Sequence, residues 1–165
     1  MPSRAALLAA ALCVAAAAQL RPAAARKVWA TVPYTVRGSV AQLASTGAKG
    51  GLDVGGQLLL DLELSEGGRP TGRVYGACRA VAAAPGGGVR TLCTNHFEWD
   101  GGDSTMVGHA SGVFKAGSAL AFKISIVGGI GKWQGAHGED LEFKFDPKSG
   151  AGGGKIVLYC LDGRC

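Results

Sequence analysis

The sequence predicts an all-β protein whose strands are joined by tight, glycine-rich turns. After residue 26 most of the chain alternates apolar and polar residues with period two, which is typical of strands that bury one face. The segment 57–65 is the clearest case, because acidic Asp61 and Glu63 alternate with leucines. The leucine face consists of Leu58, Leu60, Leu62 and Leu64. No stretch has the period of an amphipathic helix.

The same pattern predicts strands in order along the chain. Their ranges are 28–37, 57–65, 71–83, 89–99, 104–115, 119–128, 133–145 and 154–162. Turn signals lie between them, among them Gly67-Gly68, Pro85–Gly88 and Asp146–Gly150. The glycine-rich segment 47–56 is expected to be a longer loop. Short strands without crossover helices favour either a sandwich or an up-and-down barrel.

The first residues are expected to be a targeting segment. Arg4 precedes an apolar run from Ala5 to Ala18, which is shorter than the roughly 20 residues that span a bilayer but suits the core of a signal peptide. Small residues at Ala23–Ala25 offer a cleavage site, and Ala16–Ala18 is a second option. We therefore expect a signal peptide at 1–25 and one domain at 26–165. A transit peptide to the plastid is the alternative, since the segment is basic and has no acidic residue.

The charge of the chain argues against nucleic acid as a partner. The formal net charge is +5, of which the leader carries two units, and Lys and Arg form no block. No later stretch is apolar enough to span a membrane. We expect a protein secreted to the apoplast or cell wall, where a mild positive charge permits loose association with acidic polymers.

The cysteines of the mature chain are expected to form disulfides. Cys78, Cys93, Cys160 and Cys165 remain after cleavage, and an even number in a secreted domain favours two bridges with three possible connectivities. The hairpin around Pro85–Gly88 brings Cys78 near Cys93, so we prefer that pair and then Cys160 with Cys165. Pairing of Cys165 elsewhere stays open. The spacing matches no zinc pattern, and we expect no metal site.

A glycine-rich segment carries a resemblance to a known superfamily. The run from Ile126 to Asp140, with the sequence IVGGIGKWQGAHGED, resembles the glycine signature of dirigent proteins and allene oxide cyclase-like barrels. The segments 72–78 and 92–103 resemble two further strands of that family, so the likeness covers about residues 57–145. We expect positive φ at Gly128, Gly129 and Gly131, and a bend or close packing at Gly135 and Gly138.

The resemblance implies an eight-stranded antiparallel β-barrel with an apolar cavity, no cofactor, and assembly as a homotrimer or homodimer. It implies a secreted dirigent-like barrel that binds a small apolar or phenolic ligand and orients it. One alternative is an allene oxide cyclase-type isomerase acting on an unsaturated fatty-acid epoxide. Another is a non-catalytic structural or defence protein that binds glycans or cell-wall polymers. Whether the chain is an enzyme stays open.

The resemblance also suggests candidate catalytic residues. Asp61 or Glu63 can take the place of the acid on the family's early strand, although a solvated strand face is the alternative. His137 stands where dirigent proteins carry an arginine before the closing glycine. The strand 28–37 has no acid, which counts against fatty-acid cyclase activity.

Further candidates concern ligand contact. His96 and Glu98 are two residues apart and therefore share one face of a strand, as an acid–base pair would. Tyr75 and Trp133 are additional candidates, with core packing or an oligomer contact as the alternative for the tryptophan. The spacing of the histidines does not predict that they converge on a metal. The alternation alone leaves open which strand face lines the barrel, because an outer face can be buried in an oligomer.

Overall fold

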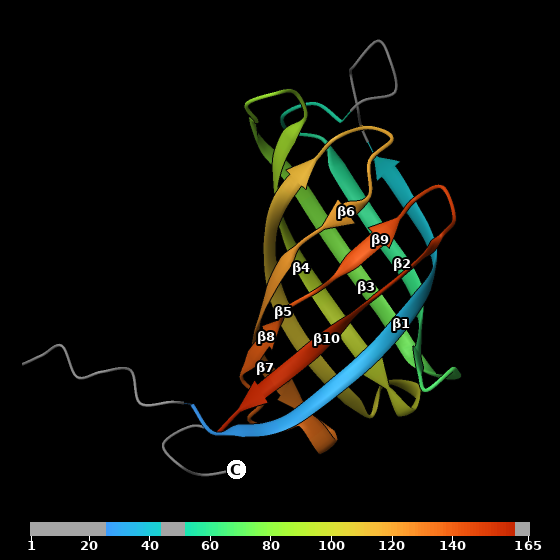
Figure 1. Ribbon diagram of the computed structural model, residues 1–165, viewed down its shortest axis with the longest axis vertical. Helices are drawn as coiled ribbons and strands as arrows, with labels where there is room; N and C mark the ends of the chain where they lie inside the picture. Colours follow the sequence, from blue (N-terminus) through green and yellow to red (C-terminus); the bar gives the residue numbers. More distant parts are fainter. Residues whose placement is uncertain (1–25, 44–51, 161–165) are drawn as a thin grey trace, which may run out of the picture.

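A computed structural model describes residues 26–43 and 52–160, and it shows a closed antiparallel β-barrel (Figure 1). Its elements are β1 (Val28–Leu43), β2 (Gln57–Glu66), β3 (Arg69–Ala83), β4 (Val89–Trp99), η1 (Asp100–Gly102), β5 (Ser104–Phe114), β6 (Leu120–Ala121), β7 (Lys123–Ile130), η2 (Gly131–Trp133), β8 (Gly138–Asp140), β9 (Lys144–Asp146) and β10 (Ala151–Tyr159). None of the helices in this part of the chain is long and apolar enough to cross a membrane.

The barrel has eight strand positions, as the sequence predicts. β6 and β7 are one strand interrupted at Phe122, and β8 and β9 together form its neighbour, since β7 pairs with β8 and β6 with β9. Both β8 and β9 then pair with β10, and β10 pairs with β1 from Val28–Tyr159 to Arg37–Ala151, which closes the barrel. Closure leaves no long strand edge open among the described residues.

The predicted strand 133–145 is wrong. The structure has the short helix η2, a turn and two three-residue strands in its place. Gly131 and Gly135 have positive φ, at 61° and 76°, so the chain turns there before β8 begins. The expected positive φ at Gly128 and Gly129 is also wrong. Gly129 instead permits a close approach, because a Cβ there would lie 2.5 Å from the carbonyl oxygen of Trp133.

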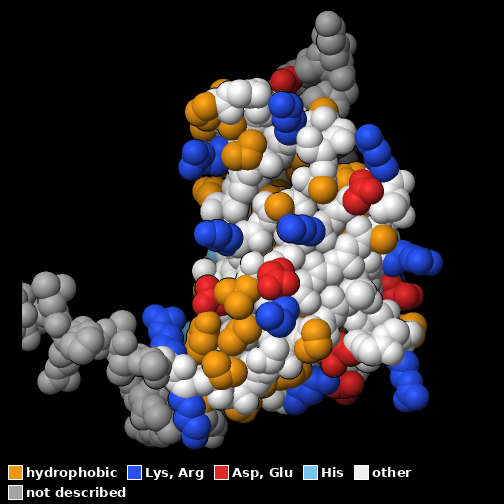
Figure 2. Space-filling model, in the orientation of Figure 1, with side chains coloured by type: hydrophobic (Ala, Val, Ile, Leu, Met, Phe, Trp, Pro, Cys, Tyr) orange, Lys and Arg blue, Asp and Glu red, His pale blue; other side chains and the backbone are white. Residues whose placement is uncertain are grey.

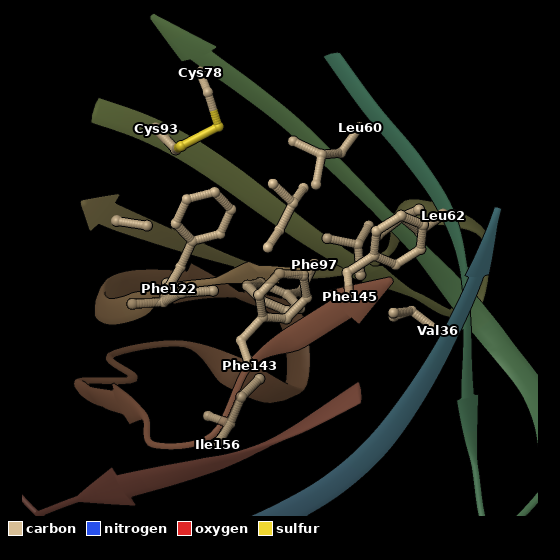
Figure 3. Close-up of a cluster of buried hydrophobic side chains, with 14 of the residues drawn as sticks. Val36, Leu60, Leu62, Cys78, Cys93, Phe97, Phe122, Phe143, Phe145 and Ile156 are labelled. Carbon is tan, nitrogen blue, oxygen red and sulfur yellow. A yellow bond between two sulfur atoms is a disulfide. The ribbon is translucent and has the colours of Figure 1, made fainter. Parts of the chain in front are cut away.

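The leucine face of β2 points into the barrel, and its acidic face points outward. Leu62 and Leu64 are fully buried, whereas Asp61 and Glu63 are exposed. Phe97, Phe145 and Ile156 meet these leucines inside the barrel (Figure 3). The interior is therefore an apolar core built from the period-two pattern.

The preferred disulfide is confirmed. Cys78 on β3 and Cys93 on β4 are directly opposite one another and are bonded, with their Cα atoms 3.9 Å apart. The pair lies on the inner wall of the barrel (Figure 3). The second predicted pair, Cys160 with Cys165, stays a prediction because Cys165 lies outside the described residues. The predicted signal peptide lies outside them as well.

Charged side chains are spread over the surface. On the face shown in Figure 2, Lys and Arg alternate with Asp and Glu without forming a block, and hydrophobic side chains gather at the lower left, where β8 and β10 lie.

Candidate functional site

Three tryptophans pack together at the end of the barrel where β4 ends, the lower end in Figure 1. Trp99 at the end of β4 is fully buried, and its ring centroid lies 5.2 Å from that of Trp133 in η2. Trp29 meets Trp133 edge-on at 6.5 Å. Lys132 lies over both the Trp99 and Trp133 rings and pairs with Asp100 at 3.1 Å. The glycine-rich run of the sequence thus contributes Lys132 and Trp133 to this end. We call Trp29, Trp99, Lys132 and Trp133 the plug.

At the opposite end, the turns beside β2, β3, β4 and β5 surround a cavity of about 480 Å³, a size typical of small-molecule sites. Its apolar lining includes Leu52, Val89 and Phe114, which are buried core residues, and Lys115 contributes to its rim. Ligand sites are common at the mouths of β-barrels.

The inner wall below this mouth is made of small side chains on three neighbouring strands. In register across the barrel wall lie the rows Ala80–Thr91–Gly112, Cys78–Cys93–Ala110 and Gly76–Asn95–Gly108. We call these residues of β3, β4 and β5 the small-residue wall. Larger inward residues, Phe97 and then Trp99, follow it down β4 towards the plug.

Aromatic rings from the interrupted strands lie against the small-residue wall. A Cβ at Gly112 would lie 2.4 Å from the Phe122 ring, so that ring packs directly on the glycine backbone. Phe122 stacks on Phe143 with centroids 5.9 Å apart and an angle of 13° between the planes. Both residues stand where a strand is broken, between β6 and β7 and between β8 and β9. The stacked pair therefore covers the Gly112 end of the small-residue wall, and both rings lie inside the barrel (Figure 3).

A buried polar pair lies inside the barrel at mid-height. The Tyr34 hydroxyl on β1 donates a hydrogen bond to Oδ2 of Asp140 on β8, and both residues are buried. Oδ1 of Asp140 accepts the backbone N–H groups of Lys155 at 3.1 Å and Glu142 at 3.3 Å. The Tyr34 ring meets Phe97 edge-on at 5.7 Å.

Burial shifts both groups of this pair toward their neutral forms. It raises the pKa of Asp140, against the opposing effect of its hydrogen bonds from Tyr34 and from the backbone of Glu142 and Lys155. Burial, followed by the negative charge of Asp140, raises the pKa of Tyr34 well above its ordinary value. The phenol therefore remains a donor, and Asp140 holds its proton to a higher pH than an exposed aspartate does.

Two of the three predicted catalytic residues, Asp61 and Glu63, lie on the outer face. Asp61 forms an ion pair with Arg73 at 2.5 Å, and both side chains are more than half exposed. Glu63 on β2 lies opposite Arg73 on β3 and is exposed. His137 is half-buried next to the plug, and its carbonyl oxygen accepts the backbone N–H of Tyr159 at 2.8 Å.

The predicted ligand-contact residues divide between the outer face and the plug. His96 and Glu98 do share one face of β4, and it is the outer one. Tyr75 lies between Asp61 and His96 in register, also outside. Trp133 belongs to the plug. His109 contacts Thr94 at 3.4 Å, and no group of three metal-binding side chains occurs in the described part of the chain.

The sequence interpretation missed Tyr34, Asp140 and Asn95 as interior polar groups. Tyr34 stands between Val32 and Val36 at period two, a signal that places it on the apolar face. Asn95 shares the face of Cys93 and Phe97 in the same way. Asp140 gave a weaker signal, because the segment that contains it is not one regular strand.

Comparisons with known proteins show the fold. No family model and no curated protein matches the chain. A pyocyanin demethylase is 22% identical with a TM-score of 0.60, over 78% of this chain and 99% of that one. A heme-binding cyclase of neoabyssomicin biosynthesis is 19% identical with a TM-score of 0.63, over 99% and 82%. A pterocarpan synthase dirigent protein is 15% identical with a TM-score of 0.61, over 81% and 96%.

These likenesses agree with the strand order and the closed sheet. The resemblance to the dirigent and cyclase barrels is confirmed at the level of fold. The chain has the eight-stranded antiparallel barrel that dirigent proteins share with several cyclases.

Proposed function

We propose that this chain is a secreted dirigent-like barrel that binds a small apolar or phenolic ligand and orients it. The observation that carries the proposal is the asymmetry of the barrel. Tryptophans pack across one end, whereas the other end has an apolar cavity at its rim, and the small-residue wall begins in the next rows of the same strands. Such a barrel admits a ligand from one side and gives it one direction of entry.

The small-residue wall favours a flat ligand. Its glycines, alanines and disulfide project no bulky side chain into the barrel. The stacked Phe122 and Phe143 rings already cover part of it. A planar ring that enters from the mouth replaces these rings against the wall when they swing aside. The strand breaks at both phenylalanines allow such a movement at smaller cost than a continuous strand would.

Orientation of the ligand follows from the shape and polarity of the interior. The barrel wall is apolar apart from a few buried polar groups. A polar atom of the ligand therefore has few hydrogen-bond partners there, and these fix its orientation. Holding one reactive conformer is sufficient to direct the outcome of a reaction whose reactive species is made elsewhere. The structural neighbours are named for cyclases, a demethylase and a pterocarpan synthase dirigent protein, which supports a small organic ligand.

Equilibrium dialysis of the mature protein against a panel of phenols, polycyclic aromatics and fatty acids tests the proposal. Saturable binding of one aromatic or apolar class at one site per chain is expected. Absence of binding to the whole panel would overturn the proposal and would favour a structural barrel whose packed leucine core is its final state. N-terminal sequencing of the chain from a secreting host tests secretion, with a start near residue 26 expected.

The buried carboxyl group favours an allene oxide cyclase-type isomerase as the second candidate. β1 supplies no acid, but Asp140 reaches the interior from β8, and its raised pKa suits hydrogen bonding to an epoxide oxygen. An isomerase of this kind would convert a chiral allene oxide faster than it cyclises spontaneously and would give one enantiomer. Racemic product at the spontaneous rate would exclude this candidate.

A further inference from the structure

Asn95 is a buried polar side chain whose donor group has no partner. Only 4% of the residue is exposed, and its side chain lies on the inner face of β4. Its Nδ2 atom is buried and makes no hydrogen bond within the described part of the chain. Leaving an amide donor unpaired in an apolar interior destabilises a protein, so such groups are uncommon.

The position of Asn95 is at the foot of the small-residue wall. It lies in register between Gly76 on β3 and Gly108 on β5. The Leu60 and Ile124 side chains pack over these glycines, so a ligand on this part of the wall displaces them. A Cβ at Gly76 would lie 2.6 Å from Asn95 Oδ1, so the amide rests its oxygen against that glycine. Below it, Phe97 and the edge-on Tyr34 ring form an aromatic floor. On the inner face of β4, Asn95 is the third residue below Val89, which lines the cavity at the mouth, after Thr91 and Cys93.

Two other buried polar residues of the inner wall, Thr91 and Asp140, have partners. Thr91 donates to the carbonyl oxygen of Gly112 at 3.4 Å, and Asp140 accepts Tyr34 and two backbone N–H groups. Thr71 Oγ1 and Trp133 Nε1 are also buried without partners, but both belong to half-buried residues near the plug. Among the described residues, Asn95 is thus the unpaired donor within the small-residue wall.

We infer that Asn95 recognises an oxygen acceptor on a planar aromatic ligand lying on the small-residue wall. Nδ2 of Asn95 donates to a carbonyl, quinone or ether oxygen, while the ring system covers the glycines and the disulfide. The inference rests on the proposed ligand-binding function and adds the class of ligand. A site built around a buried donor discriminates against an analogue without the acceptor, because the donor then stays unpaired.

A matched pair of probes tests this inference. 9-Fluorenone and fluorene have the same tricyclic frame, and only the ketone has an oxygen acceptor. We expect the wild-type protein to bind fluorenone about tenfold more tightly than fluorene, since one buried hydrogen bond changes an equilibrium by roughly that factor. In Asn95→Leu, which keeps the approximate volume, the two affinities should become equal through loss of fluorenone binding alone. Both are measured by quenching of tryptophan fluorescence and by calorimetry.

Thr94→Val is the control, since it removes a polar group from the outer face of the same strand and should keep the preference for the ketone. Without ligand, Asn95→Leu should unfold at the same urea concentration as wild type or at a higher one, because it removes an unpaired donor. Asn95→Ala checks that result with a smaller side chain.

A preference for fluorenone that persists in Asn95→Leu would overturn the inference, as would binding of both probes without preference by the wild type. Folding that fails in both Asn95 variants would also overturn it, by showing that the amide is needed structurally. Failure of the wild type to bind either probe would overturn the proposed function itself.

Discussion

Tyr34 on β1 and Asp140 on β8 are joined by a hydrogen bond inside the barrel, although β10 lies between their strands in the sheet. A Cβ on Gly154 of β10 would lie 2.7 Å from the Tyr34 hydroxyl oxygen and 2.6 Å from Oδ1 of Asp140. The glycine thus leaves the space through which the two side chains meet. The pair ties the closing strand of the barrel to the irregular part of its wall.

Replacing Tyr34 with phenylalanine should destabilise the protein and raise the pKa of Asp140 further. The hydroxyl donates to a buried carboxyl group, and loss of one partner of such a bond costs about 1–3 kcal/mol. That donor also holds the pKa of Asp140 down against burial. Urea unfolding measures the first effect, and ¹³C NMR titration of the carboxyl carbon measures the second. Tyr75→Phe, which changes an exposed tyrosine, should alter neither.

Replacing Asp140 with asparagine should change how stability depends on pH. Because the folded state holds the Asp140 proton more tightly than the unfolded state, its contribution to stability is complete below the ordinary pKa of 3.8 and is lost as pH rises through the raised pKa. The free energy of unfolding of wild type minus that of Asp140→Asn should therefore fall with rising pH and then level off. A difference that is constant between pH 3 and 8 would contradict the raised pKa.

Asp146 provides a control with the opposite sign. Backbone N–H donation from Lys148 lowers the pKa of Asp146, so its contribution to stability is present above the ordinary pKa and is lost as pH falls through the lowered one. The difference between wild type and Asp146→Asn should rise with pH over the acidic range in the same unfolding series.

Removing the Phe122 ring should destabilise the protein while improving ligand binding. The ring is buried against Gly112, and Phe→Ala substitutions at such sites cost about 3–5 kcal/mol. The space left beside the small-residue wall should accept a planar probe more tightly than wild type does, as measured by calorimetry with fluorene. Val113→Ala, at an exposed site, should leave both quantities unchanged. Weaker binding in Phe122→Ala would show that the ring is part of the site rather than its occupant.

The Cys78–Cys93 disulfide should contribute to stability without being needed for the site. The cysteines are 15 residues apart in sequence, and a loop of that length corresponds to about 3 kcal/mol in the chain-entropy account. The double variant Cys78→Ala, Cys93→Ala should lose about that much stability in urea and keep its ligand affinity, because alanine preserves the small-residue wall. Equal stability of the variant and the wild type would contradict this expectation.

Much of the barrel wall was predictable from the sequence, because each regular strand carries its own period-two signal. Leu58 to Leu64 identified β2, and the turn at Pro85–Gly88 placed Cys78 beside Cys93. The prediction of one strand at 133–145 was wrong because Gly131 and Gly135 turn the chain and Trp133 packs on Trp99 across the barrel end. That packing is a tertiary contact, and local patterning does not report it.

The interior polar groups were less predictable than the wall. The spacing of His96 and Glu98 predicts an acid–base pair on one strand face. In the structure that face is the outer one, and the neighbouring Asn95 points inward. Choosing between the two faces requires knowing which one the barrel encloses. The Tyr34–Asp140 pair depends on closure by β10 and on the short β8, so it arises only in the three-dimensional structure.

The central claim is that a ligand binds inside the barrel against the small-residue wall. Ala110 and Ser111 are adjacent on β5, with Ala110 buried in the wall and Ser111 exposed outside. Titration of fluorene into Ala110→Leu and Ser111→Leu tests the claim most directly, after circular dichroism has shown that both variants are folded. We predict that Ala110→Leu loses at least tenfold in affinity, because its side chain fills the space of the ligand, while Ser111→Leu binds as wild type does. Equal binding by both variants, or loss only in Ser111→Leu, would contradict the account and place the ligand on the outer face.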